Sequence, residues 1–134
     1  MKEVKAYPPN WAEIQRTLTP EKDTIYCWGD TVYNPSGNEI PEDVWVHEAL
    51  HTKQQEQYAS PAIWWSRYLL EPAFRLEQEL DAYAVQYAFV KEHYPAAAAA
   101  QALFDFALNL CSMYSVKLAI PTAEAQIRLR AKTI

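Results

Sequence analysis

Apolar residues recur at helical spacing along most of this chain. Trp11, Ile14 and Leu18 share one face of a short helix predicted over residues 10–18, with Asn10 as its N-cap. Proline marks most of the boundaries between the helices that follow. Further helical patterns are predicted over residues 41–58, 61–70, 73–93, 96–118 and 122–132. The chain is therefore expected to be mostly helical.

A different pattern occupies residues 24–34, where β-branched and aromatic side chains flank Gly29-Asp30. This arrangement predicts two short strands around a turn. Nothing in the chain resembles a repeat or a linker between domains. The predicted fold is mainly α with a small N-terminal β element (α+β), in a single domain spanning residues 1–134.

Composition narrows the classes of function. The 134 residues are half hydrophobic and carry a formal net charge of −5, without a basic tract, which argues against nucleic acid or an anionic membrane as a partner. The first residues lack the apolar run of a secretory signal. Cys27 and Cys111 are interpreted as free thiols of a reducing compartment. We therefore expect a soluble, cytoplasmic protein of undetermined oligomeric state.

The chemistry-bearing motif is His47-Glu48-Ala49-Leu50-His51, inside a predicted helix. Residues four apart lie on one helical face, so His47 and His51 can bind one Zn²⁺. Glu48 can then reach a water beside the ion and take its proton during attack on a carbonyl. The pattern predicts metal-dependent hydrolysis with Glu48 as general base.

A catalytic zinc site commonly has a third protein ligand, which the motif does not supply. His93 is one candidate, although its place at a helix end is equally explained by the helix dipole or by solvent. The acidic stretch of the helix at 73–93 offers Glu77, Glu79 and Asp81. Most helix carboxylates are solvated, so at most one of these three is expected to bind the ion.

At these residues the chain resembles the gluzincin-like metallopeptidases, and more closely small metallopeptidase-like proteins of bacteria and their phages. The shared pattern is HExxHxxQQ, here from His47 to Gln55, followed by an acidic helix of the form ExxA. The resemblance implies a minimal zincin-like domain that hydrolyses peptide bonds, with Zn²⁺ bound by His47, His51 and Glu79. Glu79 is favoured because Ala82 follows it by three residues, and Glu77 is the alternative.

Tyr83 departs from this family pattern, because many of the resembled proteins have an aspartate there that orients a ligand histidine. Its hydroxyl is a candidate catalytic group, either bonded to a ligand or stabilising an oxyanion, and packing is the alternative. The resembled enzymes also pair an edge strand with extended peptide, a role that residues 24–34 suit, and the alternative is that this segment only covers one side of the helical core. Trp64, Trp65 and Tyr68 are expected to be core residues, with a substrate wall as the alternative.

Three functions remain open from the sequence. The first is a zinc metallopeptidase acting on a peptide or protein substrate. The second is a non-catalytic zinc-binding structural or interaction protein, for example in phage assembly or host interaction. The third is a helical domain without metal, in which the HExxH pattern is accidental. A cleft across the metal site would favour the first, whereas a site filled by residues 95–134 would favour the second.

Overall fold

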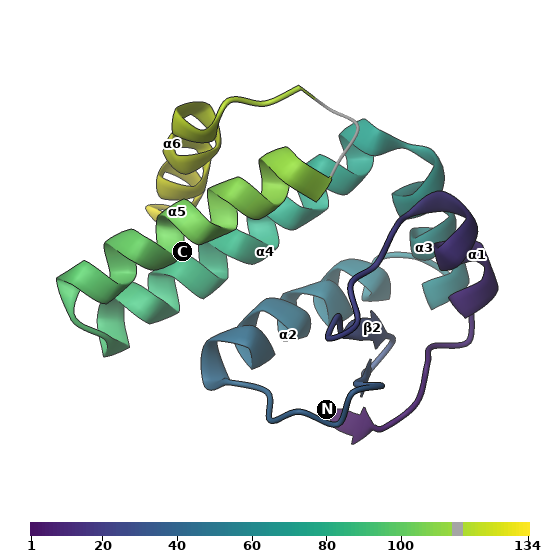
Figure 1. Ribbon diagram of the computed structural model, residues 1–134. Coiled ribbons are helices and arrows are strands. Elements are labelled where there is room, and N and C mark those ends of the chain that lie inside the picture. Colours follow the sequence, from purple (N-terminus) through teal and green to yellow (C-terminus); the bar gives the residue numbers. More distant parts are fainter. Residues whose placement is uncertain (114–116) are drawn as a thin grey trace.

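The computed structural model describes residues 1–113 and 117–134 of the chain. Its described part is mainly helical with a small sheet, which confirms the predicted α+β class (Figure 1). The helices are α1 (Trp11–Thr17), α2 (Glu42–Glu56), α3 (Pro61–Leu70), α4 (Pro72–His93), α5 (Ala96–Met113) and α6 (Ile120–Ala131). The strands are β1 (Lys2–Val4), β2 (Tyr26–Trp28) and β3 (Thr31–Tyr33).

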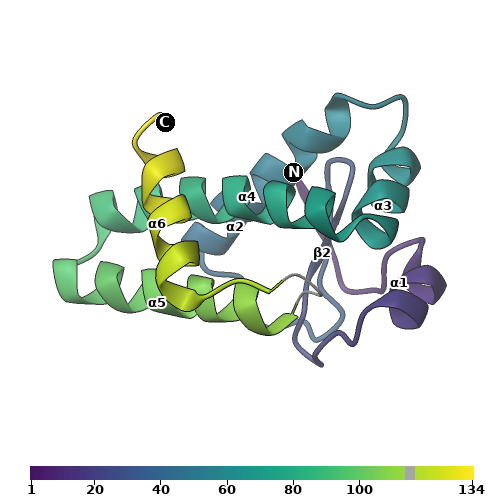
Figure 2. The same cartoon turned by 90° about the horizontal axis from the view of Figure 1, so that it is seen from above.

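The helices α4, α5 and α6 form one packed layer, in which α4 and α5 run side by side and α6 lies across them (Figure 2). Leu103, Ala107 and Leu110 of α5 recur at helical spacing and are buried against Leu80 of α4 and Ile127 of α6. These three helices hold the larger of the two apolar clusters, in which α5 and α6 pack against α4.

The prediction of one helix from residue 96 to residue 118 is wrong at its end. The described part of α5 stops at Met113, and residues 117–119 are not helical; residues 114–116 of that prediction lie outside the described residues. Pro121 sits in the first turn of α6, where its missing N–H costs nothing, whereas inside a continuous helix it would remove a hydrogen bond. The break lets α6 fold back onto α4 and α5.

The sheet has the strand order β1-β3-β2, with β1 parallel and β2 antiparallel to β3. The turn between β2 and β3 contains Gly29 at a φ of 62°, which a glycine adopts without strain. The two predicted strands are confirmed. Strand β1 was missed because its three residues are all exposed and show no alternation of apolar and polar side chains.

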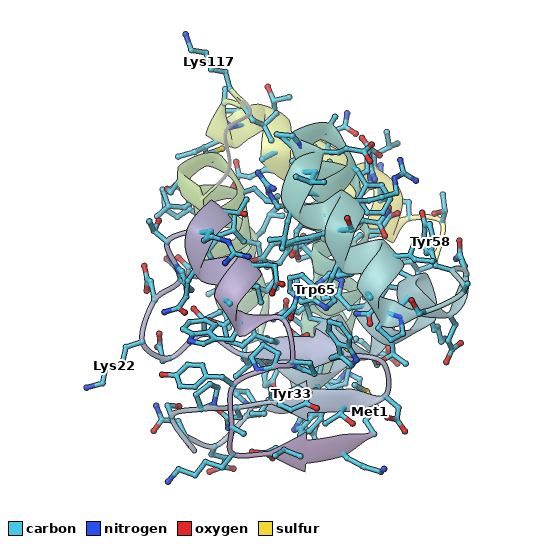
Figure 3. All side chains as sticks on the ribbon, turned by 90° about the vertical axis from the view of Figure 1, so that its right-hand side faces the viewer. Met1, Lys22, Tyr33, Tyr58, Trp65 and Lys117 are labelled. Atoms are coloured by element: carbon cyan, nitrogen blue, oxygen red, sulfur yellow. The ribbon has the colours of Figure 1, made fainter. Side chains whose placement is uncertain are left out.

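A second apolar cluster joins the sheet to α1 and α3. Ile14, Tyr26, Trp64 and Trp65 are buried in it, and Figure 3 shows Trp65 in the interior of the molecule. The expected core role of the α3 aromatic residues is confirmed. Asn10 precedes α1 as predicted, but its side chain makes no capping hydrogen bond.

Helix α2 lies between these two clusters, packed on α4 and on β2 (Figure 1). Its buried side chains are polar or charged, namely His47, Glu48, His51, Gln54 and Gln55. No helix within the described ranges is long and apolar enough to span a membrane. A helix that buries a polar face must pair those polar groups with hydrogen-bond partners inside the protein.

Candidate metal centre

The buried face of α2 follows the usual helical spacing but carries polar residues. Positions 47, 51, 54 and 55 stand at i, i+4, i+7 and i+8, the places where an amphipathic helix normally presents apolar side chains to the core. Glu42 and Asp43 occupy the first turn, where the helix dipole favours negative charge. The local sequence thus forms a stable helix and aims its histidines inward, as predicted.

Three potential ligand atoms converge between α2 and α4. The Nε2 atoms of His47 and His51 lie 3.1 Å apart, and Oε1 of Glu79 lies 3.0 Å from the first and 3.2 Å from the second. All three side chains are buried. The ligand atoms of His47, Glu48 and His51 also lie within 4.8 Å of one another, so Glu48 stands beside the same point.

Two glutamines fix the orientation of the imidazoles. The Gln86 amide donates to Oδ2 of Asp43 over 2.7 Å, which turns its Oε1 toward Nδ1 of His47 at 2.9 Å. The Gln54 amide donates to a backbone carbonyl of α4 over 3.0 Å, and its Oε1 lies 2.8 Å from Nδ1 of His51. Because both glutamine oxygens can only accept, both Nδ1 atoms must donate. Each neutral imidazole therefore presents its Nε2 lone pair to the centre.

This arrangement places three acceptors within hydrogen-bonding distance and requires a positive charge between them. Ligand atoms about 2.0 Å from a tetrahedral zinc ion lie about 3.3 Å from one another, close to the separations seen between His47, His51 and Glu79. Two imidazoles and a carboxylate are also ligand types that divalent transition metals accept. The donor set therefore fits a small metal ion.

The electrostatics of the three side chains lead to the same conclusion. Burial disfavours the charged form of His51, but the Glu79 carboxylate outweighs it and raises the pKa of His51 to about 9. Burial likewise disfavours the charged form of Glu79, but the adjacent imidazoles hold its pKa well below the usual range. The site thus attracts positive charge, whether that of a proton or that of a metal ion.

Glu48 has a different environment from Glu79. Burial raises its pKa, the imidazoles of His51 and His47 oppose that effect, and the nearby Glu79 carboxylate adds to it. A carboxylate with a raised pKa accepts a proton more readily than an exposed glutamate does. Glu48 is therefore placed and tuned to accept a proton beside the centre.

A cavity of about 440 Å³ lies over the centre. Its walls include Glu48, Tyr68, Tyr83, Asn109 and the segment 23–27, which leads into β2. A cavity of this size is within the range that holds small ligands or a few residues of a peptide. Helix α5 contributes Asn109 to the wall, and the described part of residues 95–134 leaves this volume open.

Three of the candidate ligands lie elsewhere. Glu77 and Asp81 both bind Arg130 of α6, at 2.7 and 2.8 Å, with their side chains largely exposed. His93 ends α4, where its ring stacks on Phe89 and its Nδ1 lies 2.9 Å from the Phe89 carbonyl. The structure therefore brings Glu79 to the histidines and leaves the alternative Glu77 on the opposite side of α4.

Tyr83 lies close to the centre, on the face of α4 that also carries Glu79. Its ring packs edge-on to His47 at a centroid distance of 4.6 Å and stacks on Phe106 of α5 at 4.9 Å. Its hydroxyl shares a hydrogen bond with Asn109, while burial raises its pKa. The ring makes the contacts of a packing residue, and a catalytic role for the hydroxyl stays a prediction. In the resembled proteins an aspartate at this position accepts from a ligand histidine, and here Gln86 provides that acceptor for His47 instead.

No role was predicted for Gln55, whose side chain links α2 to the β2–β3 hairpin by hydrogen bonds. Its Oε1 accepts from the Gly29 amide at 2.7 Å and its Nε2 donates to the Cys27 carbonyl at 2.9 Å. Thr52 adds a hydrogen bond of 2.8 Å to the Gly29 carbonyl. The paired glutamines of the motif therefore have separate functions, since Gln54 orients His51 and Gln55 holds the edge strand beside the centre.

Sequence reasoning missed Gln86, and it considered Tyr68 only as a core residue or a substrate wall and not as a partner of Glu79. The available signal was spacing, because Gln86 follows Glu79 by seven residues and so shares its helical face. Comparison of the chain with protein-family models, with curated proteins and with solved structures finds no match. The structure itself shows a buried His-Glu-His group that could hold a metal ion.

Proposed function

We propose that this protein is a zinc-dependent hydrolase that cleaves peptide bonds. The observation that carries the proposal is the convergence of His47 Nε2, His51 Nε2 and Glu79 Oε1 at 3.0–3.2 Å, with both imidazoles oriented by glutamines. These three residues would hold the ion. Bound there, zinc would supply a Lewis acid that polarises a carbonyl and lowers the pKa of water.

Glu48 would be the proton carrier of the reaction. It follows His47 directly on α2 and lines the cavity, so its carboxylate can accept a proton from water and return it to the leaving amine. Its buried position and raised pKa suit both halves of that exchange. General acid–base catalysis of this kind typically contributes about 10²–10⁴ in rate.

The cavity supports a catalytic use of the centre over a purely structural one. Structural zinc sites are usually closed by four protein ligands, whereas catalytic sites keep one position for water and substrate. Here β2 and α3 both contribute walls of the cavity. Strand β2 lies at the edge of the sheet, with β3 on one side only. Its other edge faces α2, where the Cys27 carbonyl already accepts from Gln55 and Trp65. An extended peptide would therefore approach along the segment before Cys27.

The test uses Glu48→Gln, with Glu77→Gln as a matched control on an exposed glutamate. Metal content is measured by elemental mass spectrometry, and hydrolysis is followed on a mixed peptide library by mass spectrometry. We expect about one zinc per chain in all three proteins. Hydrolysis should persist in wild type and the control and fall by about 10² or more in Glu48→Gln. Undiminished cleavage by Glu48→Gln would refute its assignment, and a wild type without metal would refute the proposal as a whole.

A further inference from the structure

The two oxygens of the Glu79 carboxylate have different surroundings. Oε1 faces the imidazoles of His47 and His51, whereas Oε2 accepts a hydrogen bond of 2.5 Å from the Tyr68 hydroxyl. A length of 2.5 Å is typical of a charge-assisted O–H···O⁻ bond, which is about twice as strong as a neutral one. The carboxylate is therefore held from both sides, and its rotation would break one contact or the other.

We propose that Tyr68 is a positioning residue that makes Glu79 a one-oxygen ligand and so keeps one coordination position open. This inference rests on the proposed function, because it concerns the same metal centre. A carboxylate can bind a metal through one oxygen or through both. With a second carboxylate oxygen bound beside the two imidazoles and a water, the ion would already have five ligands, and the fifth position that a catalytic zinc uses for substrate would be taken. By engaging Oε2, the hydroxyl leaves only Oε1 for the ion.

The rest of α3 holds the Tyr68 ring in place. The ring stacks on Trp64 at a centroid distance of 4.9 Å and meets Trp65 edge-on at 5.1 Å. Arg75, in the first turns of α4, donates to the Tyr68 backbone carbonyl over 2.7 Å and ties the end of α3 to α4. The aromatic cluster thus has a second function besides forming the core, since it fixes a hydroxyl relative to a carboxylate on the neighbouring helix.

The test replaces the hydroxyl and reads the coordination directly. Tyr68→Phe keeps the ring and its stacking, so the fold is expected to be retained. Tyr87→Phe is the matched control, because it removes the same group from a buried tyrosine of α4 that does not line the cavity. Each purified chain is loaded with one equivalent of Co²⁺, and its visible spectrum is recorded. The zinc-loaded chains are examined in parallel by X-ray absorption to count the nearest oxygen and nitrogen atoms.

We expect wild type and Tyr87→Phe to give the intense visible bands of four-coordinate cobalt. Tyr68→Phe should give weaker bands and one additional oxygen around zinc, because Glu79 is then free to bind through both oxygens. Identical spectra for Tyr68→Phe and wild type would overturn the assignment of Tyr68 and leave the proposed function standing. A wild type that gives no cobalt bands and takes up no zinc would instead overturn the metal centre, and the role of Tyr68 with it.

Discussion

The two glutamates at positions 77 and 79 allow a sharp test of the metal centre. They belong to the same helix and carry the same side chain, yet Glu79 is buried against the histidines while Glu77 is exposed and paired with Arg130 at 2.7 Å. Replacing each by alanine removes one carboxylate from opposite sides of α4. We expect only Glu79→Ala to change the stabilisation of the protein by zinc, since exposed ion pairs contribute about 0–1 kcal/mol and do not involve the ion.

The size of the effect follows from binding linkage. Free zinc at about 100 times its Kd adds about 2.7 kcal/mol to the stability of the folded state, which for a chain of this length raises Tm by about 10 °C. Loss of one ligand that weakens binding about a hundredfold reduces this increment to about 0.4 kcal/mol at the same zinc concentration, or about 2 °C. Glu77→Ala should keep the full increment.

The assay compares the Tm of each protein with added zinc and with a chelator, followed by circular dichroism. Each variant is its own reference, so a change in the stability of the metal-free fold cancels. Equal zinc increments in Glu79→Ala and wild type would refute Glu79 as a ligand. An increment lost in Glu77→Ala but kept in Glu79→Ala would assign the third ligand to the other glutamate, against the geometry described above.

Two further predictions concern the paired glutamines of α2. Gln54→Leu removes the acceptor for Nδ1 of His51, so zinc affinity should fall about 10- to 100-fold in a competition titration with a chelator, and wild-type affinity would contradict this role. Gln55→Leu leaves the amide of Gly29 without its acceptor, so the metal-free protein should lose about 1–3 kcal/mol of stability in urea unfolding. An unchanged unfolding midpoint would show that the link between α2 and the hairpin is not stabilising.

The sequence predicted where most helices and strands lie more accurately than it predicted the residues at which they end. Periodicity located most of the helices because they bury an apolar stripe, whereas the buried face of α2 is polar, and proline marked most of the boundaries. The end of α5 was misplaced, because the apolar pattern continues to Ile120 while residues 117–119 are not helical. Strand β1 left no pattern at all, since its pairing with β3 depends on backbone hydrogen bonds and its side chains are exposed.

The histidine pair and Glu48 could be read from the sequence because their relation is local. Spacing of four residues on one helix fixes which side chains are neighbours, whatever the rest of the chain does. Glu79 and Glu77 could not be separated with the same certainty, because their helix is remote in sequence and its rotation is set by packing. The apolar contacts of Leu80 with α5 and α6 turn Glu79 toward α2 and leave Glu77 beside Arg130.

The sequence by itself therefore determined the class of fold, the helix that carries the HExxH motif and the order of its residues, since these follow from periodicity and from the reach of neighbouring turns. Only the tertiary structure decided which carboxylate meets the histidines, which glutamines orient them, and that Tyr68 binds the far oxygen of Glu79. These contacts join residues 3 to 39 positions apart, most of them on different helices. Apart from the local contact between Gln54 and His51 within α2, their geometry is set by how the helices pack, which spacing along the chain does not encode.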